Sequence, residues 1–171
     1  MPKNPELLIL LALLFGGCPE PPEDPPTAPD PIGEELLHTE SVWGLEGCER
    51  SVLYREGRSL QFQCFTLEET FSWENRGALS IEGMNALDTE LAAADLSDTE
   101  PGDYMGLCGS SDANAASMTV QVQGQSVTYG PYCPTRGMES LNEILWTLLG
   151  DISDCTELDV LTSVDDGCRA Y

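Results

Sequence analysis

Seven cysteines are the residues of this sequence most able to do chemistry. No two of them have the C-x-x-C spacing of a zinc site or of a thioredoxin-like redox pair. An odd total is unusual in an exported protein unless one cysteine has a separate role. Setting Cys18 aside leaves an even set, which is typical of an oxidising compartment: Cys48, Cys64, Cys108, Cys133, Cys155 and Cys168. We therefore expect disulfides, no metal site and no cofactor.

Six cysteines allow 15 different pairings, and the spacing favours one of them. Each successive pair encloses one local unit of the chain. We therefore expect Cys48 with Cys64 around a first hairpin turn, Cys108 with Cys133 around a second hairpin, and Cys155 with Cys168 around the C-terminal tail.

Nucleophilic catalysis requires a base held against its nucleophile by packing. The single histidine, His38, precedes the expected strands and helices and lies in the approach to the domain. The single lysine, Lys3, lies at the extreme N-terminus, so no Ser–Lys dyad is expected. We predict no catalytic residues, and we expect that the protein is not an enzyme.

Carboxylates are abundant, but no arrangement of them is diagnostic. The stretch Asp98-Thr99-Glu100-Pro101-Gly102-Asp103 has oxygen ligands at alternate positions, and the tail contains Asp159, Asp165 and Asp166. Neither segment has the full calcium-loop spacing with its bidentate Glu. A glycosidase needs two carboxylates that face each other across a cleft, and the sequence selects no such pair. A carboxylate-dependent hydrolase or a calcium-binding domain therefore remains the alternative function.

Three strands are predicted in the first half of the chain by alternating apolar residues. Two of them, over 51–55 and 60–65, flank the turn Glu56-Gly57-Arg58 and form a hairpin. A third strand is expected over 70–79, where Phe71 and Trp73 alternate with polar residues.

The apolar spacing changes to three or four residues after this strand, which predicts a helix. Ser80 is placed to cap its N-terminus. Its apolar stripe consists of Ile81, Met84, Leu87, Leu91 and Ala94.

A second hairpin with a turn at Gln123-Gly124 is followed by a second helix over about 138–149, which Gly150 is placed to end. The chain is thus expected to contain strands followed by a helix twice. We predict an α+β fold in which an antiparallel sheet built from two hairpin units carries two helices on one face and is stapled by three disulfides.

The N-terminus has the layout of a signal peptide. Lys3 precedes an apolar run over 7–15, which is too short to span a bilayer, and two glycines stand before Cys18. The stretch Leu14-Phe15-Gly16-Gly17-Cys18 resembles the lipobox of bacterial lipoproteins. This resemblance covers only the targeting segment, and it implies cleavage before Cys18 and attachment to a membrane through acyl chains on that cysteine. The alternative is a plain secretory signal, in which Cys18 is an ordinary cysteine.

The resemblance also bears on which membrane is involved. In lipoprotein families an Asp after the lipidated cysteine is the common inner-membrane retention signal, whereas this chain has Pro19. We therefore expect the outer membrane, with the domain facing the periplasm or the cell surface.

A spacer follows the lipidated cysteine. Seven of the thirteen residues from Pro19 to Pro31 are proline, with acidic residues between them. Such a segment favours polyproline II and spans roughly 40 Å at about 3.1 Å per residue. We divide the chain into a signal peptide (1–17), a lipidated cysteine with a proline- and acid-rich linker (18–40), and a single acidic domain (41–171).

Charge restricts the class of partner. From Cys18 onward the chain has six Arg, no Lys and 29 Asp and Glu, so its net charge remains −23. Nucleic acid is not an expected partner, because binding phosphates requires a basic surface. We predict a membrane-anchored exported lipoprotein with a non-catalytic binding or envelope role and an unidentified protein partner. One form of that role is an inhibitor, in which the acidic loop over 95–103 enters a basic cleft of an exported hydrolase.

Overall fold

The computed structural model describes residues 26–40, 48–102, 106–108, 116–155, 161–164 and 168. The helices and strands in these residues are β1 (Glu34–Glu40), β2 (Arg50–Glu56), β3 (Ser59–Phe65), β4 (Phe71–Leu79), α2 (Ile81–Ala93), β5 (Ser117–Val122), β6 (Gln125–Tyr129), the 3-10 turn η2 (Arg136–Met138), α3 (Glu139–Ser153) and β7 (Leu161–Val164). Among the described residues, no helix is long and apolar enough to cross a membrane.

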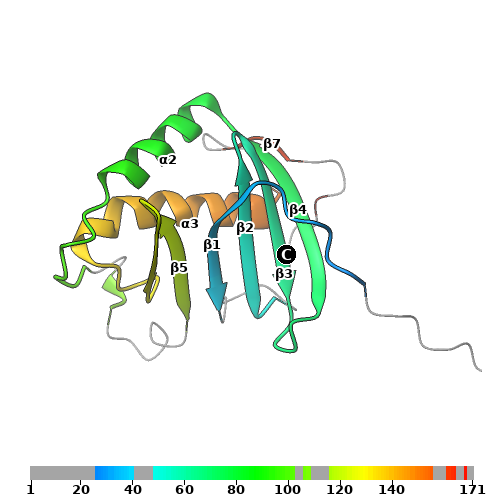
Figure 1. Cartoon of the computed structure of the whole chain (residues 1–171), viewed down its shortest axis with the longest axis horizontal. Coiled ribbons are helices and arrows are strands. Elements are labelled where there is room, and N and C mark those ends of the chain that lie inside the picture. The colour runs from blue at the N-terminus through cyan, green and yellow to red at the C-terminus, as the bar shows by residue number, and fades with distance from the viewer. Residues whose placement is uncertain are drawn as a thin grey trace, which may run out of the picture.

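One antiparallel sheet forms the framework of the domain, with the strand order β6-β5-β1-β2-β3-β4-β7. The first four strands form a meander, the β5–β6 hairpin adds beside β1, and β7 adds beside β4. Both helices lie on one face of this sheet (Figure 1). The predicted α+β class is confirmed, and the two expected hairpin units belong to a single continuous sheet.

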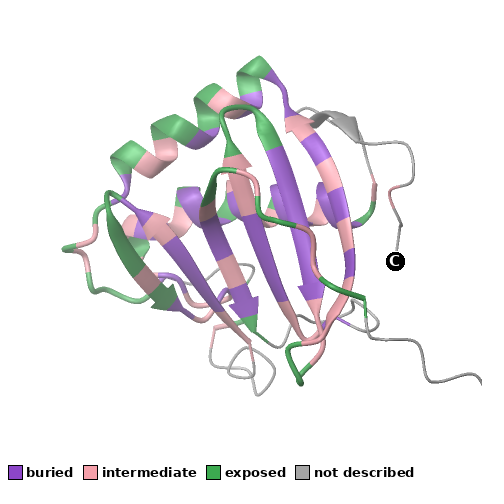
Figure 2. Ribbon diagram, turned by 45° about the vertical axis from the view of Figure 1, so that its right-hand side comes forward, coloured by how far each residue is buried: buried purple, intermediate pink, exposed green. Residues whose placement is uncertain are grey.

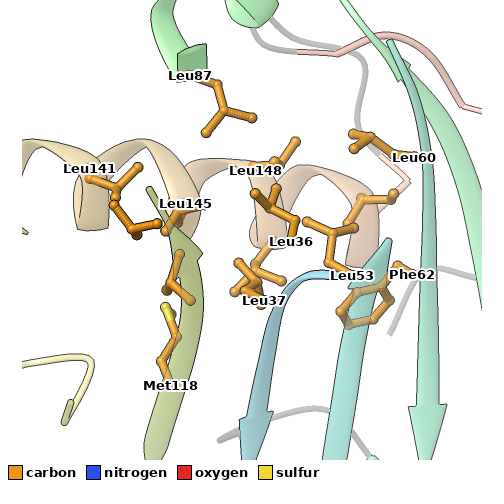
Figure 3. Packing of buried hydrophobic residues seen from close by; sticks show 14 of the residues in the cluster. Leu36, Leu37, Leu53, Leu60, Phe62, Leu87, Met118, Leu141, Leu145 and Leu148 are labelled. Carbon is orange, nitrogen blue, oxygen red and sulfur yellow. The ribbon is translucent and has the colours of Figure 1, made fainter. Parts of the chain in front are cut away.

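The hydrophobic core lies between this face of the sheet and the helices. Leu37, Leu53 and Phe62 project from the central strands toward Leu145 and Leu148 of α3 (Figure 3). Phe62 also packs on Trp73 of β4, with ring centroids 5.4 Å apart. Apolar burial of this kind is the main source of stability in a domain of this size.

Helix α2 begins where the sequence predicts, because Ser80 accepts a hydrogen bond from the Gly83 N–H at 2.7 Å. Its apolar stripe is shorter than predicted. Leu87 is fully buried, whereas Ile81 is 55% exposed at the first turn. The stripe therefore faces the core only from the second turn onward.

Helix α3 runs through Gly150 to Ser153, so the prediction that Gly150 ends it is wrong. The last turn is retained because Ile152 is completely buried. In addition, the Ile152 carbonyl accepts a hydrogen bond from Asn75 Nδ2 on β4 at 2.9 Å. These tertiary contacts outweigh the small preference of Gly for a helix end.

The predicted boundary between linker and domain at residue 40 is also wrong, because residues 34–40 form β1 in the middle of the sheet, between β2 and β5. Leu36 and Leu37 are 6% and 0% exposed. Their burial makes this segment part of the core. The acidic residues around them, Glu34, Glu35 and Glu40, give the segment the composition of the linker that precedes it.

The last residues of the proline-rich segment are held against β3, on the face of the sheet opposite the helices, which we call the open face (Figure 2). Gln63 Nε2 donates to the Pro29 carbonyl at 2.8 Å. The Ile32 N–H donates to Gln61 Oε1 at 2.8 Å. The proline-rich segment thus meets the domain over β3.

Three disulfides close the structure, in the sequential pairing. Cys48 bonds Cys64, Cys108 bonds Cys133 and Cys155 bonds Cys168, with Cα–Cα distances of 5.1, 4.9 and 5.8 Å. The third pair spans β7, a strand that the sequence analysis included in the C-terminal tail.

Candidate functional site

A bulge in β1 creates the most distinctive polar cluster of the open face. The register of β1 against β2 shifts between Glu35 and Leu37. This shift allows Leu36 and Leu37 both to be buried, and it brings Glu35 and His38 to the same face. Bulges commonly redirect side chains in this way, and they are frequent beside functional sites.

Glu35 and His38 interact directly, with 2.7 Å between Oε1 of Glu35 and Nδ1 of His38. With Nδ1 as the donor, the carboxylate orients the ring and leaves Nε2 as an acceptor. His38 thus lies in a strand of the sheet, and its predicted place in the approach to the domain is wrong.

Among the described residues, no hydroxyl group is hydrogen bonded to His38. Its cross-strand neighbour, Thr119, shares a 2.7 Å hydrogen bond with Thr128 instead. The arrangement therefore provides an oriented imidazole beside a carboxylate, which suits recognition of a hydrogen-bond donor or a cation.

Tyr54 extends the cluster, because it is the cross-strand partner of Glu35. Partial burial raises the pKa of its phenol, the charge of Glu35 raises it further, and Arg50 acts in the opposite direction. Tyr54 therefore remains a protonated hydrogen-bond donor well into the alkaline range.

A hollow of about 300 Å³ adjoins the cluster at the end of β1 and is lined by Glu34, Glu35, Leu36, Arg55, Gly57, Leu91 and Gln121. Arg55 is engaged at this site, since it donates to Asp88 at 2.6 Å and to the Gly57 carbonyl at 2.8 Å. Glu35 is engaged by His38, so Glu34 is the charged group of the described lining that forms no ion pair. This volume is at the small end of known binding pockets and matches one side chain or a small molecule.

The loop considered as a calcium site is stabilised by its own hydrogen bonds. Asp98 Oδ1 accepts from the Glu100 N–H at 2.9 Å. Asp95 Oδ1 accepts from the Ser97 hydroxyl and N–H, and these bonds lower the pKa of the Asp95 carboxyl. No group of three or more potential metal ligands occurs in the part of the chain that the structure describes. Asp103, Asp159, Asp165 and Asp166 lie outside the described residues.

The same loop is fixed to the segment before α3. The Gly102 N–H donates to the Pro134 carbonyl at 2.8 Å, and the Arg136 N–H donates to the Glu100 carbonyl at 2.8 Å. A Cβ at Gly137 would clash with the carbonyl of Asp95, so this close approach requires glycine. The acidic loop is thus held in one conformation by backbone contacts.

Comparison with known proteins gives no match: no protein-family model fits the chain, and neither a curated protein nor a solved structure matches it. The candidate site therefore depends on the geometry of this chain alone.

His38 was considered from the sequence only to be set aside as a catalytic base, and neither Glu35 nor Tyr54, the residues that make it distinctive, was predicted. The signal that could have identified Glu35 is the apolar pair Leu36-Leu37 between polar residues, shortly after Pro31. Two adjacent buried residues in a strand imply a bulge, which changes the face of every residue before it.

Proposed function

We propose that this chain is an exported lipoprotein, cleaved before Cys18 and held on the outer membrane by acyl chains on that cysteine. The observation that carries the proposal is the cysteine pairing. Every cysteine after Cys18 is in a disulfide, which supports an oxidising compartment and gives Cys18 a separate role.

The test of the anchor is the variant Cys18→Ser, expressed in a Gram-negative host and labelled with radioactive palmitate. We expect the wild-type chain to be labelled and to sediment with membranes, and Cys18→Ser to be unlabelled. The matched control is Cys48→Ala/Cys64→Ala, which removes two cysteines and should keep the label. Equal labelling of Cys18→Ser and wild type would reject lipidation at this residue.

The outer-membrane assignment has its own test, Pro19→Asp. Because Asp after the lipidated cysteine is the common retention signal, we expect this variant to fractionate with inner-membrane vesicles and the wild type with outer-membrane vesicles. Identical fractionation of the two chains would reject the assignment.

The domain itself we propose to be a non-catalytic binding module that contacts its partner through the β5–β1–β2 half of the open face. This proposal is supported by the oriented His38–Glu35 pair and by the acidic hollow beside it. Carboxylates next to a hollow favour a basic side chain on the partner.

Affinity capture from envelope extracts tests this surface. We compare Glu34→Gln/Glu35→Gln with Glu82→Gln/Glu143→Gln, a pair that removes the same charge from the exposed faces of α2 and α3. The wild type and the helix variant should capture the same protein, and Glu34→Gln/Glu35→Gln should lose it. If both variants weakened capture equally, the net charge of the domain rather than the position of the carboxylates would determine binding.

An inhibitor is a second form of the binding role, and it would act through the acidic loop over 95–102 rather than through the open face. This loop is exposed at Glu100 and is fixed by its bonds to Pro134 and Arg136. A preorganised loop loses little conformational entropy on binding. We therefore expect the protein to inhibit an exported hydrolase with a basic cleft, and Gly137→Ala to weaken inhibition by loosening the loop. Inhibition unchanged by Gly137→Ala would reject this role for the loop.

A further inference from the structure

Strand β6 ends one side of the sheet with unpaired backbone groups. Its turn, Gln123-Gly124, has φ values of 51° and 76° at the two residues, as in a type I′ hairpin. The closing pair of such a hairpin is hydrogen bonded and the pattern then alternates, so the N–H and C=O of Ser126 and Thr128 point away from β5. Within the described part of the chain, these groups make no backbone hydrogen bond.

This edge lacks the usual protection against another strand. Gln125, Ser126 and Thr128 are exposed, and β6 lies at the edge in Figure 2. The strand contains neither proline nor a charged residue, and its pairing with β5 is regular. Natural edge strands are commonly protected from further pairing by a proline, a charged residue or a bulge.

The charge distribution indicates which partner fits. Residues 113–135, which include the whole β5–β6 hairpin, contain no charged residue, although the chain carries a net charge of −23. Two copies of such a chain repel each other wherever their carboxylates meet. This hairpin is a surface where two copies can approach without bringing charges together.

We propose that a second copy of this chain docks at this edge, its β6 antiparallel to that of the first, so that two sheets become one. The twofold axis passes beside Val127. Ser126 of one protomer then opposes Thr128 of the partner subunit, and the outward N–H and C=O groups of both protomers are satisfied. The half-buried Val127 side chains meet on the helix side of the joined sheet.

Cysteine cross-linking tests the register of this dimer. In the proposed dimer the two Val127 residues form a non-hydrogen-bonded antiparallel pair. The Cα atoms of such a pair are about 4.5 Å apart, which a disulfide can span. We expect full-length Val127→Cys in membranes, mildly oxidised, to give a covalent dimer on a non-reducing gel. The matched control is Thr89→Cys, which places a cysteine on the exposed face of α2 and should remain monomeric.

Thr128→Pro, added to Val127→Cys, tests whether the backbone makes the contact. The Thr128 N–H points away from β5. Proline therefore removes a hydrogen-bond donor from the exposed edge and leaves the backbone hydrogen bonds to β5 in place. We expect cross-linking to fall by about tenfold, since the dimer loses two symmetry-related hydrogen bonds.

If Thr128→Pro impairs folding, Thr128→Glu replaces it, with Thr89→Glu as the control of equal charge. Only the edge variant should reduce the cross-linked dimer. Equal cross-linking of Val127→Cys and Thr89→Cys, insensitivity to the edge variants, or a Val127→Cys cross-link to a different protein would each overturn the proposal.

Discussion

Tyr129 is a residue whose chemistry depends on burial. Its side chain is 9% exposed, and its hydroxyl donates to the Met118 sulfur at 3.5 Å. Burial raises the pKa of Tyr129 far above its ordinary value of 10.0, because the phenolate has no solvation in the core.

This shift predicts a loss of stability at high pH. Above pH 10 the unfolded chain releases the Tyr129 proton and the folded chain keeps it, so the free energy of unfolding falls as pH rises toward the folded pKa. One such group costs about 1.4 kcal/mol at pH 11. Tyr129→Phe should therefore lose less stability than wild type between pH 8 and pH 11, as measured by urea unfolding.

Tyr132→Phe is the control for this experiment, because it removes a phenol that stacks on Trp146 at the half-buried surface. We expect Tyr132→Phe to follow the wild-type pH dependence. An identical pH dependence for Tyr129→Phe and wild type would mean that the Tyr129 phenol ionises in the folded protein near its ordinary pKa.

At the scale of elements, the start of α2 depends on one side chain. The Ser80 hydroxyl satisfies the Gly83 N–H, which has no acceptor within the helix. We expect Ser80→Ala to lower the free energy of unfolding by about 1 kcal/mol. The measurement is urea unfolding monitored by circular dichroism.

Ser80→Thr retains the hydroxyl and serves as the matched variant, with an expected loss smaller than that of Ser80→Ala. If Ser80→Thr were destabilised as much as Ser80→Ala, retaining the hydroxyl would not rescue the helix start, and loss of the cap would not explain the effect of Ser80→Ala.

Elements with a local periodic signal were predictable, and those defined by distant partners were not. The β2–β3 hairpin, β4 and α2 follow from alternation, turn residues and a cap within each segment. Strand β1 contains a bulge and is stabilised by β2 and β5 on its two sides. Three of its seven residues are glutamate, and its apolar residues are adjacent rather than alternating, so its own sequence does not predict a strand.

At the scale of the whole molecule, repulsion among carboxylates opposes the compact state. The net charge is −23, and salt screens charges beyond about 8 Å at 0.15 M. We expect the melting temperature at pH 7 to rise by a few degrees between 10 mM and 500 mM NaCl, at about 3 °C for each kcal/mol gained. Differential scanning calorimetry measures this change.

The same salt series near pH 4.1, the sequence isoelectric point, is the control. There the net charge is close to zero, so the effect of salt should largely disappear. If salt raised the melting temperature equally at both pH values, the cause would be stronger burial of apolar surface rather than screening of charges.

The sequence by itself determined the properties that depend on composition and local spacing: the acidic charge, the α+β class and most strands and helices. Only the tertiary structure decided that β1 belongs to the sheet, that Glu35 and His38 face the same side, and that β6 is an edge. These features arise from pairing between segments far apart in the chain. Such pairing is fixed by the best burial of the whole core rather than by the residues of one segment.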